Sequence, residues 1–137
     1  MTWPMVSATE YNLVARHEND TERLMNTAGN LLFVAETIGQ VIQNKVFASN
    51  QWDLANGCSG VTGACYDLLQ IDKGFQRAPQ YFAFPLWNHF GPSMVSVTSN
   101  LDAVSVLSVY AGQVNSSTYS INLGSEGYIE FRIKRGF

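Results

Sequence analysis

Charged residues are scarce in this chain of 137 residues. Asp, Glu, Lys and Arg make up 14% of the sequence, and the formal net charge is -3. No dense run of Lys and Arg occurs, whereas a surface that binds nucleic acid or an anionic membrane needs clustered positive charge. The sequence therefore argues against both kinds of partner.

Long hydrophobic runs are also missing, so we expect no membrane-spanning helix. The first residues have neither the basic segment nor the apolar segment of a secretory signal, so the chain is either cytosolic or a mature or truncated piece. Aromatic residues reach 12%, and Asn, Ser, Thr and Gly are plentiful. This composition favours an extracellular, sugar-handling protein, and we predict a secreted or extracellular location.

Cysteine and histidine occur only twice each. Cys58 and Cys65 bracket a flexible loop that can close as a small disulfide ring or stay reduced. His17 and His89 have no Cys or His at the spacing of metal ligands. We therefore expect no metal and no cofactor.

The length suits one domain with its own core. Residues 1–92 alternate between strand-like and helical patterns, and from residue 93 the hydrophobic period changes to two. We expect a mixed α+β fold in a single domain, 1–137, with a βα-rich half, 1–92, and an antiparallel β half, 93–137.

A strand–helix–strand (βαβ) unit is expected in residues 1–92. Met5, Val6 and Ala8 are typical of a buried parallel strand that ends at Glu10, and Val46–Trp52 has the composition of a second strand. Strands joined by a helix are parallel neighbours, so Glu10 and Trp52 should lie at the same end of the sheet.

The expected helix connects these strands and is about twenty residues long. Asn19 or Asp20 is placed to cap its first turn. The apolar residues at helical spacing are Leu24, Ala28, Leu31, Leu32, Ala35, Ile38 and Ile42. Another helix is expected over Pro79–Phe90, kinked or split by Pro85.

Four antiparallel strands in a meander are expected in the second half, because β-forming residues alternate there between turn signals. The expected strands are Met94–Thr98, Val104–Ala111, Ser117–Leu123 and Gly127–Lys134.

Glu10 is the first candidate for chemistry. It lies beside Thr9, Tyr11 and Asn12, whose polar groups can fix and ionise a carboxylate. Such a carboxylate can attack an anomeric carbon or act as a general base, although a strand-end Glu can equally be merely solvated. Trp52 can stack on a sugar ring or belong to the core.

Four segments together resemble the closing part of retaining glycoside hydrolases with a (β/α)8 barrel, of the α-L-arabinofuranosidase-like and cellulase-like kind. These segments are Thr9–Asn12, Leu31–Ala35, Ala48–Gly57 and Pro79–Ala83. In that family the seventh strand ends in the nucleophilic Glu, the eighth ends in an aromatic residue that floors the sugar site, and a β-sandwich follows the barrel.

The resemblance implies that Glu10 matches the nucleophile, that Trp52 matches the sugar-stacking residue, and that residues 93–137 belong to the sandwich. The chain matches only the last two βα units, and the family's acid/base Glu lies on the fourth strand. Retaining enzymes hold two carboxyl groups about 5 Å apart. Asp53 is our candidate for the second carboxyl, with Asp67 or a partner chain as alternatives.

The predicted function is therefore a glycoside hydrolase-like protein acting on plant-type poly- or oligosaccharides. The predicted catalytic residues are Glu10 and Asp53, and the predicted substrate-binding residues are Tyr11, Asn12, Asn50, Trp52 and Tyr66. The alternatives are a non-catalytic carbohydrate-binding module and an inactive truncated domain. We also expect a homo-oligomer, because an incomplete barrel exposes a strand edge and an apolar helix face.

Overall fold

The computed structural model describes residues 5–88, 90–96, 107–114 and 117–124. Contacts divide the chain into two compact units, residues 1–83 and 84–137. Whether the two units form the single predicted domain stays a prediction, and each unit is described by itself.

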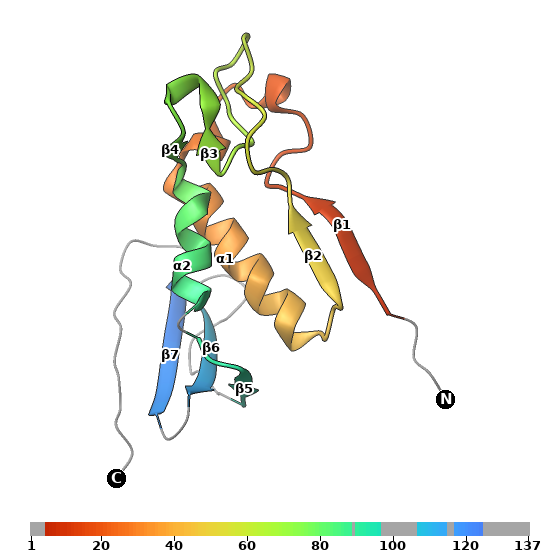
Figure 1. The fold of residues 1–137 in the computed structure, drawn as a ribbon, viewed down its shortest axis with the longest axis vertical. Helices are drawn as coiled ribbons and strands as arrows, with labels where there is room; N and C mark the ends of the chain where they lie inside the picture. Colours follow the sequence, from red (N-terminus) through yellow and green to blue (C-terminus); the bar gives the residue numbers. More distant parts are fainter. Residues whose placement is uncertain (1–4, 89, 97–106, 115–116, 125–137) are drawn as a thin grey trace. The chain divides into compact units, whose positions relative to one another are not determined.

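Among the residues that the structure describes, the secondary structure mixes two α-helices with short sheets (Figure 1). The strands and α-helices are β1 (Ser7–Tyr11), α1 (Ala28–Gln43), β2 (Ala48–Gln51), β3 (Leu69–Gln70), β4 (Gln76–Arg77), α2 (Ala83–Asn88), β5 (Ser93–Val95), β6 (Leu107–Val114) and β7 (Ser117–Gly124). Short 3-10 helices cover His17–Asn19, Leu24–Asn26, Ile71–Lys73 and Pro79–Phe82. The predicted mixed α+β class is thus confirmed.

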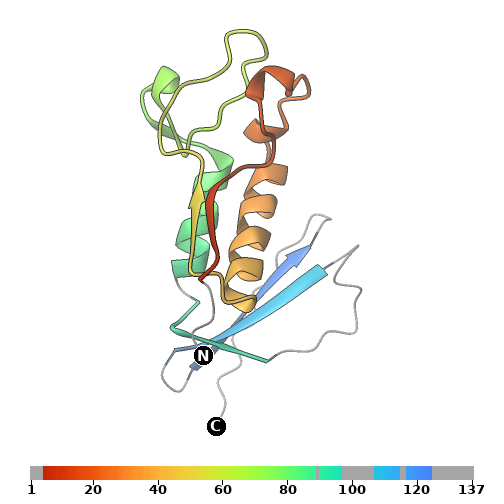
Figure 2. The same ribbon diagram turned by 90° about the vertical axis from the view of Figure 1, so that its right-hand side faces the viewer.

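The strands β1 and β2 pair in parallel and are joined through α1, as the sequence predicts. Ala8 pairs with Ser49 and Tyr11 pairs with Gln51, so the register shifts between these two pairs. One extra residue of β1 is accommodated there, which makes a local bulge of the kind that redirects side chains. Both strands run toward the loops at the same end of the unit (Figures 1 and 2).

The expectation that β1 begins in a buried run is wrong. Met5 is 73% exposed and Val6 is 63% exposed, and Phe47 beside them is 68% exposed. The backbone N–H of Phe47 donates to the carbonyl of Val6 at 2.8 Å, so these residues lie at the same end of the strand pair. Parallel strands are normally covered on both faces by other elements, and this two-stranded sheet lacks such cover at the end where Met5, Val6 and Phe47 lie.

The helix α1 begins later than predicted. Its N-cap is Thr27, whose hydroxyl oxygen accepts from the N–H of Gly29 at 3.2 Å. Arg23 has a left-handed backbone conformation, with φ of 55°, which interrupts a helix before that point. Asp20 does cap, but it caps the preceding 3-10 turn, because its carboxylate accepts from the N–H groups of Leu24 and Met25.

The buried face of α1 also differs from the predicted apolar face. Asn30, Val34, Ala35 and Gly39 are buried, whereas Ile42 is 41% exposed. The helix contacts the 3-10 helix Pro79–Phe82 and the strand β2. Small residues allow this close approach, which a pattern of apolar residues alone does not reveal.

The segment predicted as one helix over 79–90 is split. Pro79 opens a 3-10 helix, and the α-helical part is α2. Pro85 lies within the first turn of α2, where a missing N–H costs no helical hydrogen bond. The helix is therefore split as expected, but the split lies between residues 82 and 83 and not at Pro85.

One buried hydrophobic cluster of the first unit lies beyond the ends of β1 and β2. Met25 and Ala64 are fully buried there beside Tyr66, and Leu13 and Val14 pack against them. This cluster holds the loop after β1 against the loop after β2, and so fixes the region where the candidate site lies.

The second unit contains an antiparallel sheet in the order β5-β6-β7. Trp87 packs on Phe90 and Tyr110, with ring centroids 4.6 and 5.4 Å apart. Gly112 passes so close to Phe90 that a Cβ on Gly112 would overlap the Phe90 carbonyl oxygen. The predicted fourth strand, 127–134, lies outside the described residues. Within the described ranges, neither α-helix has both the length and the hydropathy that crossing a bilayer requires.

Candidate functional site

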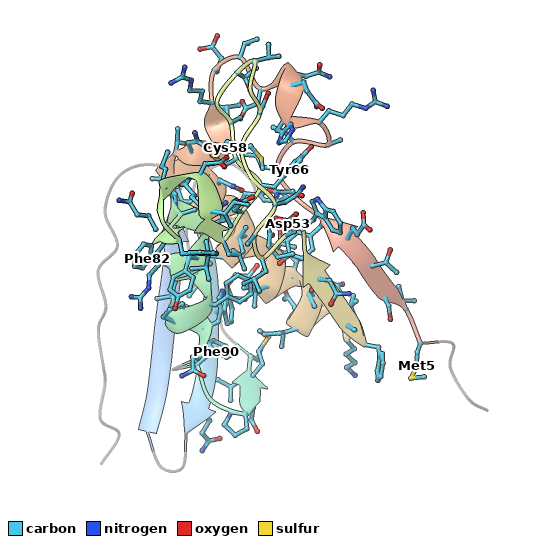
Figure 3. The ribbon with its side chains drawn as sticks, turned by 45° about the horizontal axis from the view of Figure 1, so that its top comes forward. Met5, Asp53, Cys58, Tyr66, Phe82 and Phe90 are labelled. Atoms are coloured by element: carbon cyan, nitrogen blue, oxygen red, sulfur yellow. A yellow bond between two sulfur atoms is a disulfide. The ribbon has the colours of Figure 1, made fainter. Side chains whose placement is uncertain are left out.

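A pocket of about 350 Å³ opens where β1 and β2 end. Its lining residues are Glu10, Tyr11, Asn12, Val14, Ala15, Trp52 and Tyr66. The pocket therefore combines the end of β1, the loop that follows β1, the residue after β2 and one residue from the second loop. Figure 3 shows Asp53 just beyond β2 and Tyr66 and Cys58 further on, with Met5 at the opposite end of the strand pair.

Glu10 and Trp52 line this pocket together, as expected for residues at the same end of parallel neighbours. Glu10 is exposed, and Trp52 is 42% exposed. Among the lining residues, Glu10 contributes the only carboxylate. The site therefore offers one anionic group and one aromatic surface to a ligand.

The neighbours of Glu10 do not fix its carboxylate as the sequence suggests. Within the described part of the chain, no hydrogen bond or ion pair holds that carboxylate. Instead, Tyr11 shares a hydrogen bond with the Ser49 side chain, and burial raises the pKa of the Tyr11 phenol while this bond opposes the rise.

Asn12 braces the pocket in a way that its residue type alone does not reveal. Its side-chain amide donates to the carbonyl of Trp52, and its side-chain oxygen accepts from the N–H of Leu13 at 2.8 Å. Asn12 therefore ties the end of β1 to the residue that presents the indole. The peptide bond between Trp52 and Asp53 is cis.

Tyr66 is held firmly as one wall of the pocket. Its hydroxyl accepts from the N–H of His17 at 2.8 Å and donates to the carbonyl of Ala15 at 2.9 Å. The imidazole of His17 stacks on one face of the ring, with centroids 4.4 Å apart, and Tyr66 is only 9% exposed. His17 therefore covers one face of the Tyr66 ring, so a sugar could contact only the other face or the edge of the ring.

His17 and the small wall residues Val14 and Ala15 were not predicted from the sequence. The sequence contains no signal for Val14 and Ala15, which line the pocket from the loop after β1, or for His17, which lies outside the lining and stacks on Tyr66. His17 contributes through its backbone and its stacked ring, and its Nδ1 is buried without a partner in the described residues.

Asp53 does not line the pocket. Burial raises the pKa of its carboxyl, and the nearby Asp67 carboxylate raises it further, against the lowering effects of a backbone hydrogen bond and of His17. Its Oδ1 is buried with no partner among the described residues. A carboxyl with a raised pKa keeps its proton to higher pH, which is the property that a general acid needs.

Asp67, the alternative second carboxylate, has a structural role. It is fully buried, and both of its oxygens accept from the N–H of Gly57, at 3.0 and 2.9 Å. It also does not line the pocket. Asn50 likewise lies outside the lining, and its side chain donates to the carbonyl of Thr9 at 3.3 Å.

No group of three or more His, Cys, Asp and Glu side chains in the described ranges is arranged to hold a metal ion. Comparisons of the chain with models of known families, with curated proteins and with solved structures find no significant match.

Proposed function

We propose that this chain is a carbohydrate-active protein of the glycoside hydrolase type. The observation that carries the proposal is that the Glu10 carboxylate and the Trp52 indole line one pocket at the ends of parallel neighbouring strands. An aromatic face next to a carboxylate suits a sugar, whose C–H bonds stack on the ring while its anomeric carbon or hydroxyl groups meet the anion. Plant-type poly- or oligosaccharides are the proposed ligands.

In the catalytic form of this proposal, Glu10 acts as the nucleophile or the general base. Asp53 is the proposed acid, and its raised pKa supports that role. Asp53 adjoins Trp52 in sequence but does not line the pocket, so its side chain would have to turn toward a bound sugar to donate the proton. A carboxylate from a second chain is the alternative source of the acid.

The finer description of the fold belongs to the same proposal. Residues 1–92 would correspond to the last two βα units of a barrel-like enzyme, and residues 93–137 would form a four-stranded antiparallel meander belonging to a sandwich. The parallel pair β1-β2 and the antiparallel order β5-β6-β7 are compatible with this description. The Cys58–Cys65 disulfide supports a secreted location, because disulfides persist in oxidising compartments.

Non-catalytic carbohydrate binding is the second candidate function. The presence of a single carboxylate among the lining residues favours it, because hydrolysis requires two groups with different roles. In that case, Trp52 would supply the main contact and Glu10 would accept hydrogen bonds from sugar hydroxyls.

A second copy of the chain is the proposed protein partner. The exposed cluster Met5, Val6 and Phe47 and an apolar hollow of about 370 Å³ on α1 near Phe33 and Val41 are the surfaces that it would cover. Burying such surfaces removes apolar area from water, which stabilises the assembly.

The proposal is tested by assaying the purified protein on aryl glycosides and on soluble arabinan and glucan. Glu10→Gln should lower hydrolysis by about 100-fold or more while leaving sugar binding in place, because it removes the charge and keeps the shape. The matched control is Glu22→Gln, an exposed carboxyl outside the pocket, which should retain wild-type activity.

Equal activity of the Glu10→Gln and Glu22→Gln variants would contradict the catalytic proposal. If the wild type binds oligosaccharides but releases no reducing sugar between pH 4 and 8, with binding lost in Trp52→Ala, the binding-module function replaces it. Phe47→Ala is the matched control for that substitution, since Phe47 is an exposed aromatic residue at the other end of β2. An absence of both binding and hydrolysis would contradict the sugar proposal altogether.

A further inference from the structure

The disulfide between Cys58 and Cys65 closes a short ring in the loop after β2. Within the ring, the N–H of Ser59 donates to the carbonyl of Ala64 at 2.8 Å, and the N–H of Gly63 donates to the carbonyl of Ser59 at 2.8 Å. The ring is therefore an ordered turn that the disulfide closes at its base.

This ring holds the loop that follows β1. The Nε of Arg23 donates to the carbonyl of Thr62 at 2.7 Å, and the hydroxyl of Thr62 donates to the carbonyl of His17 at 2.7 Å. The side chain of Asn26 donates to the carbonyl of Gly63 at 2.8 Å and accepts from the N–H of Cys65 at 3.0 Å. Four hydrogen bonds thus join segment 17–26 to the ring.

The ring leads directly into the pocket wall, because Tyr66 follows Cys65. The hydroxyl of Tyr66 joins the backbone of His17 to that of Ala15, and Tyr66 and Ala15 both line the pocket. The disulfide and the wall are therefore neighbouring parts of one network, in which the position of Tyr66 depends on the position of the ring.

We propose that the Cys58–Cys65 disulfide is a redox-sensitive brace for the pocket, and that its reduction loosens the wall formed by Ala15 and Tyr66 and weakens sugar binding. The effect on sugar binding rests on the proposed function, whereas the loosening does not. Oxidised protein is the binding-competent form.

The reductant is a dithiol, and the exchange is balanced. Cys65 is fully buried and Cys58 is half-buried, so a thiolate of the dithiol attacks the sulfur of Cys58 and releases the thiolate of Cys65. The second thiol of the reagent then displaces Cys58. Both cysteines end as thiols after taking up two protons, and the dithiol ends as a disulfide.

Hydrogen exchange of the full chain tests the loosening directly. After reduction with dithiothreitol and alkylation, amide exchange in residues 59–66 and 13–26 should rise by about tenfold, while the exchange of α1 stays unchanged. Cys58→Ser with Cys65→Ser should behave in the same way. In the oxidised protein, Asn26→Ala should raise exchange in the ring, whereas Asn44→Ala, an exposed Asn at the end of α1, should not.

The functional arm uses the aryl glycoside or oligosaccharide that the oxidised protein accepts. Reduction should raise KM or Kd about threefold or more, and reoxidation should reverse the change.

Unchanged exchange after reduction overturns the inference whatever the protein binds. Exchange that also rises throughout α1 overturns it as well, because the disulfide would then support the whole unit rather than the wall. Raised local exchange with unchanged KM or Kd overturns the link to the pocket. Raised local exchange in a protein that neither binds nor hydrolyses sugars leaves the brace standing and contradicts the proposed function instead.

Discussion

Side chains near the pocket differ in how firmly the protein holds them. Asn12 and Tyr66 each make two hydrogen bonds to backbone groups of the pocket region, whereas the Glu10 carboxylate has no partner in the described residues. A free carboxylate can meet a ligand without first breaking a bond inside the protein. The braced residues fix the shape of the pocket, and Glu10 is the reactive group of the proposed function.

The raised pKa of the Asp53 carboxyl should make the stability of the protein depend on pH. The folded-state pKa of this carboxyl is raised, so the folded protein binds more protons than the unfolded chain between the unfolded and folded pKa values. Stability should therefore fall as pH rises through that window and stay lower above it. Asp53→Asn removes a partly buried charge, so it should raise the free energy of unfolding above the folded pKa and change it little at acid pH.

Urea unfolding of wild type and Asp53→Asn over a series of pH values checks this expectation. Glu22→Gln serves as the control for the removal of one carboxylate from an exposed position. A stabilisation by Asp53→Asn that is greatest at low pH would contradict the assignment, because it has the opposite sign.

Individual elements are positioned by caps and by close backbone contacts rather than by apolar patterns alone. Thr27 starts α1, and Asp20 caps the 3-10 turn before it. In the second unit, β6 passes Phe90 at a distance that only a glycine permits at position 112. A single side-chain carbon at such a contact changes the packing of the whole element.

Gly112→Ala should therefore destabilise the second unit by about 2 kcal/mol or more, because the added Cβ meets backbone atoms that cannot move aside by rotation. Gly60→Ala is the matched control, since nothing lies within 4 Å of a Cβ at that position, and its effect should stay within about 0.5 kcal/mol. Urea unfolding followed by near-ultraviolet circular dichroism measures both. Equal stability of the two variants would show that β6 does not approach Phe90 this closely.

For the molecule as a whole, the first unit leaves apolar side chains in contact with water. Met5, Val6 and Phe47 are 63% to 73% exposed and lie at one end of the strand pair. Clusters of this kind mark interaction surfaces, whereas a single exposed apolar residue such as Val61 needs no explanation.

Phe47→Asp should therefore lower the apparent molar mass of the protein in sedimentation velocity experiments, because a charge in an apolar contact disfavours association. Val61→Asp, at the exposed tip of the disulfide ring, is the control and should leave the mass unchanged. If the wild type sediments as a monomer at all concentrations up to the millimolar range, the homo-oligomer proposal is contradicted.

The sequence by itself determined the mixed fold class, the parallel pairing of β1 and β2, and the meeting of Glu10 with Trp52. These features follow from local hydrophobic periodicity and from the rule that strands joined by a helix lie parallel. The sequence also left both states of the cysteines open, and the structure contains the disulfide.

Only the tertiary structure decided what surrounds that pair. The start of α1 at its N-cap Thr27, the exposure of Met5 and Val6, and the burial of Asp67 against the N–H of Gly57 are features of the folded chain that the hydrophobic pattern did not predict. Asn50 and Asp53 lie near Trp52 in the chain yet outside the lining of the pocket, so closeness in sequence did not decide which side chains share the site. Periodicity specifies which face of an element is apolar, but the path of a loop decides which side chains meet.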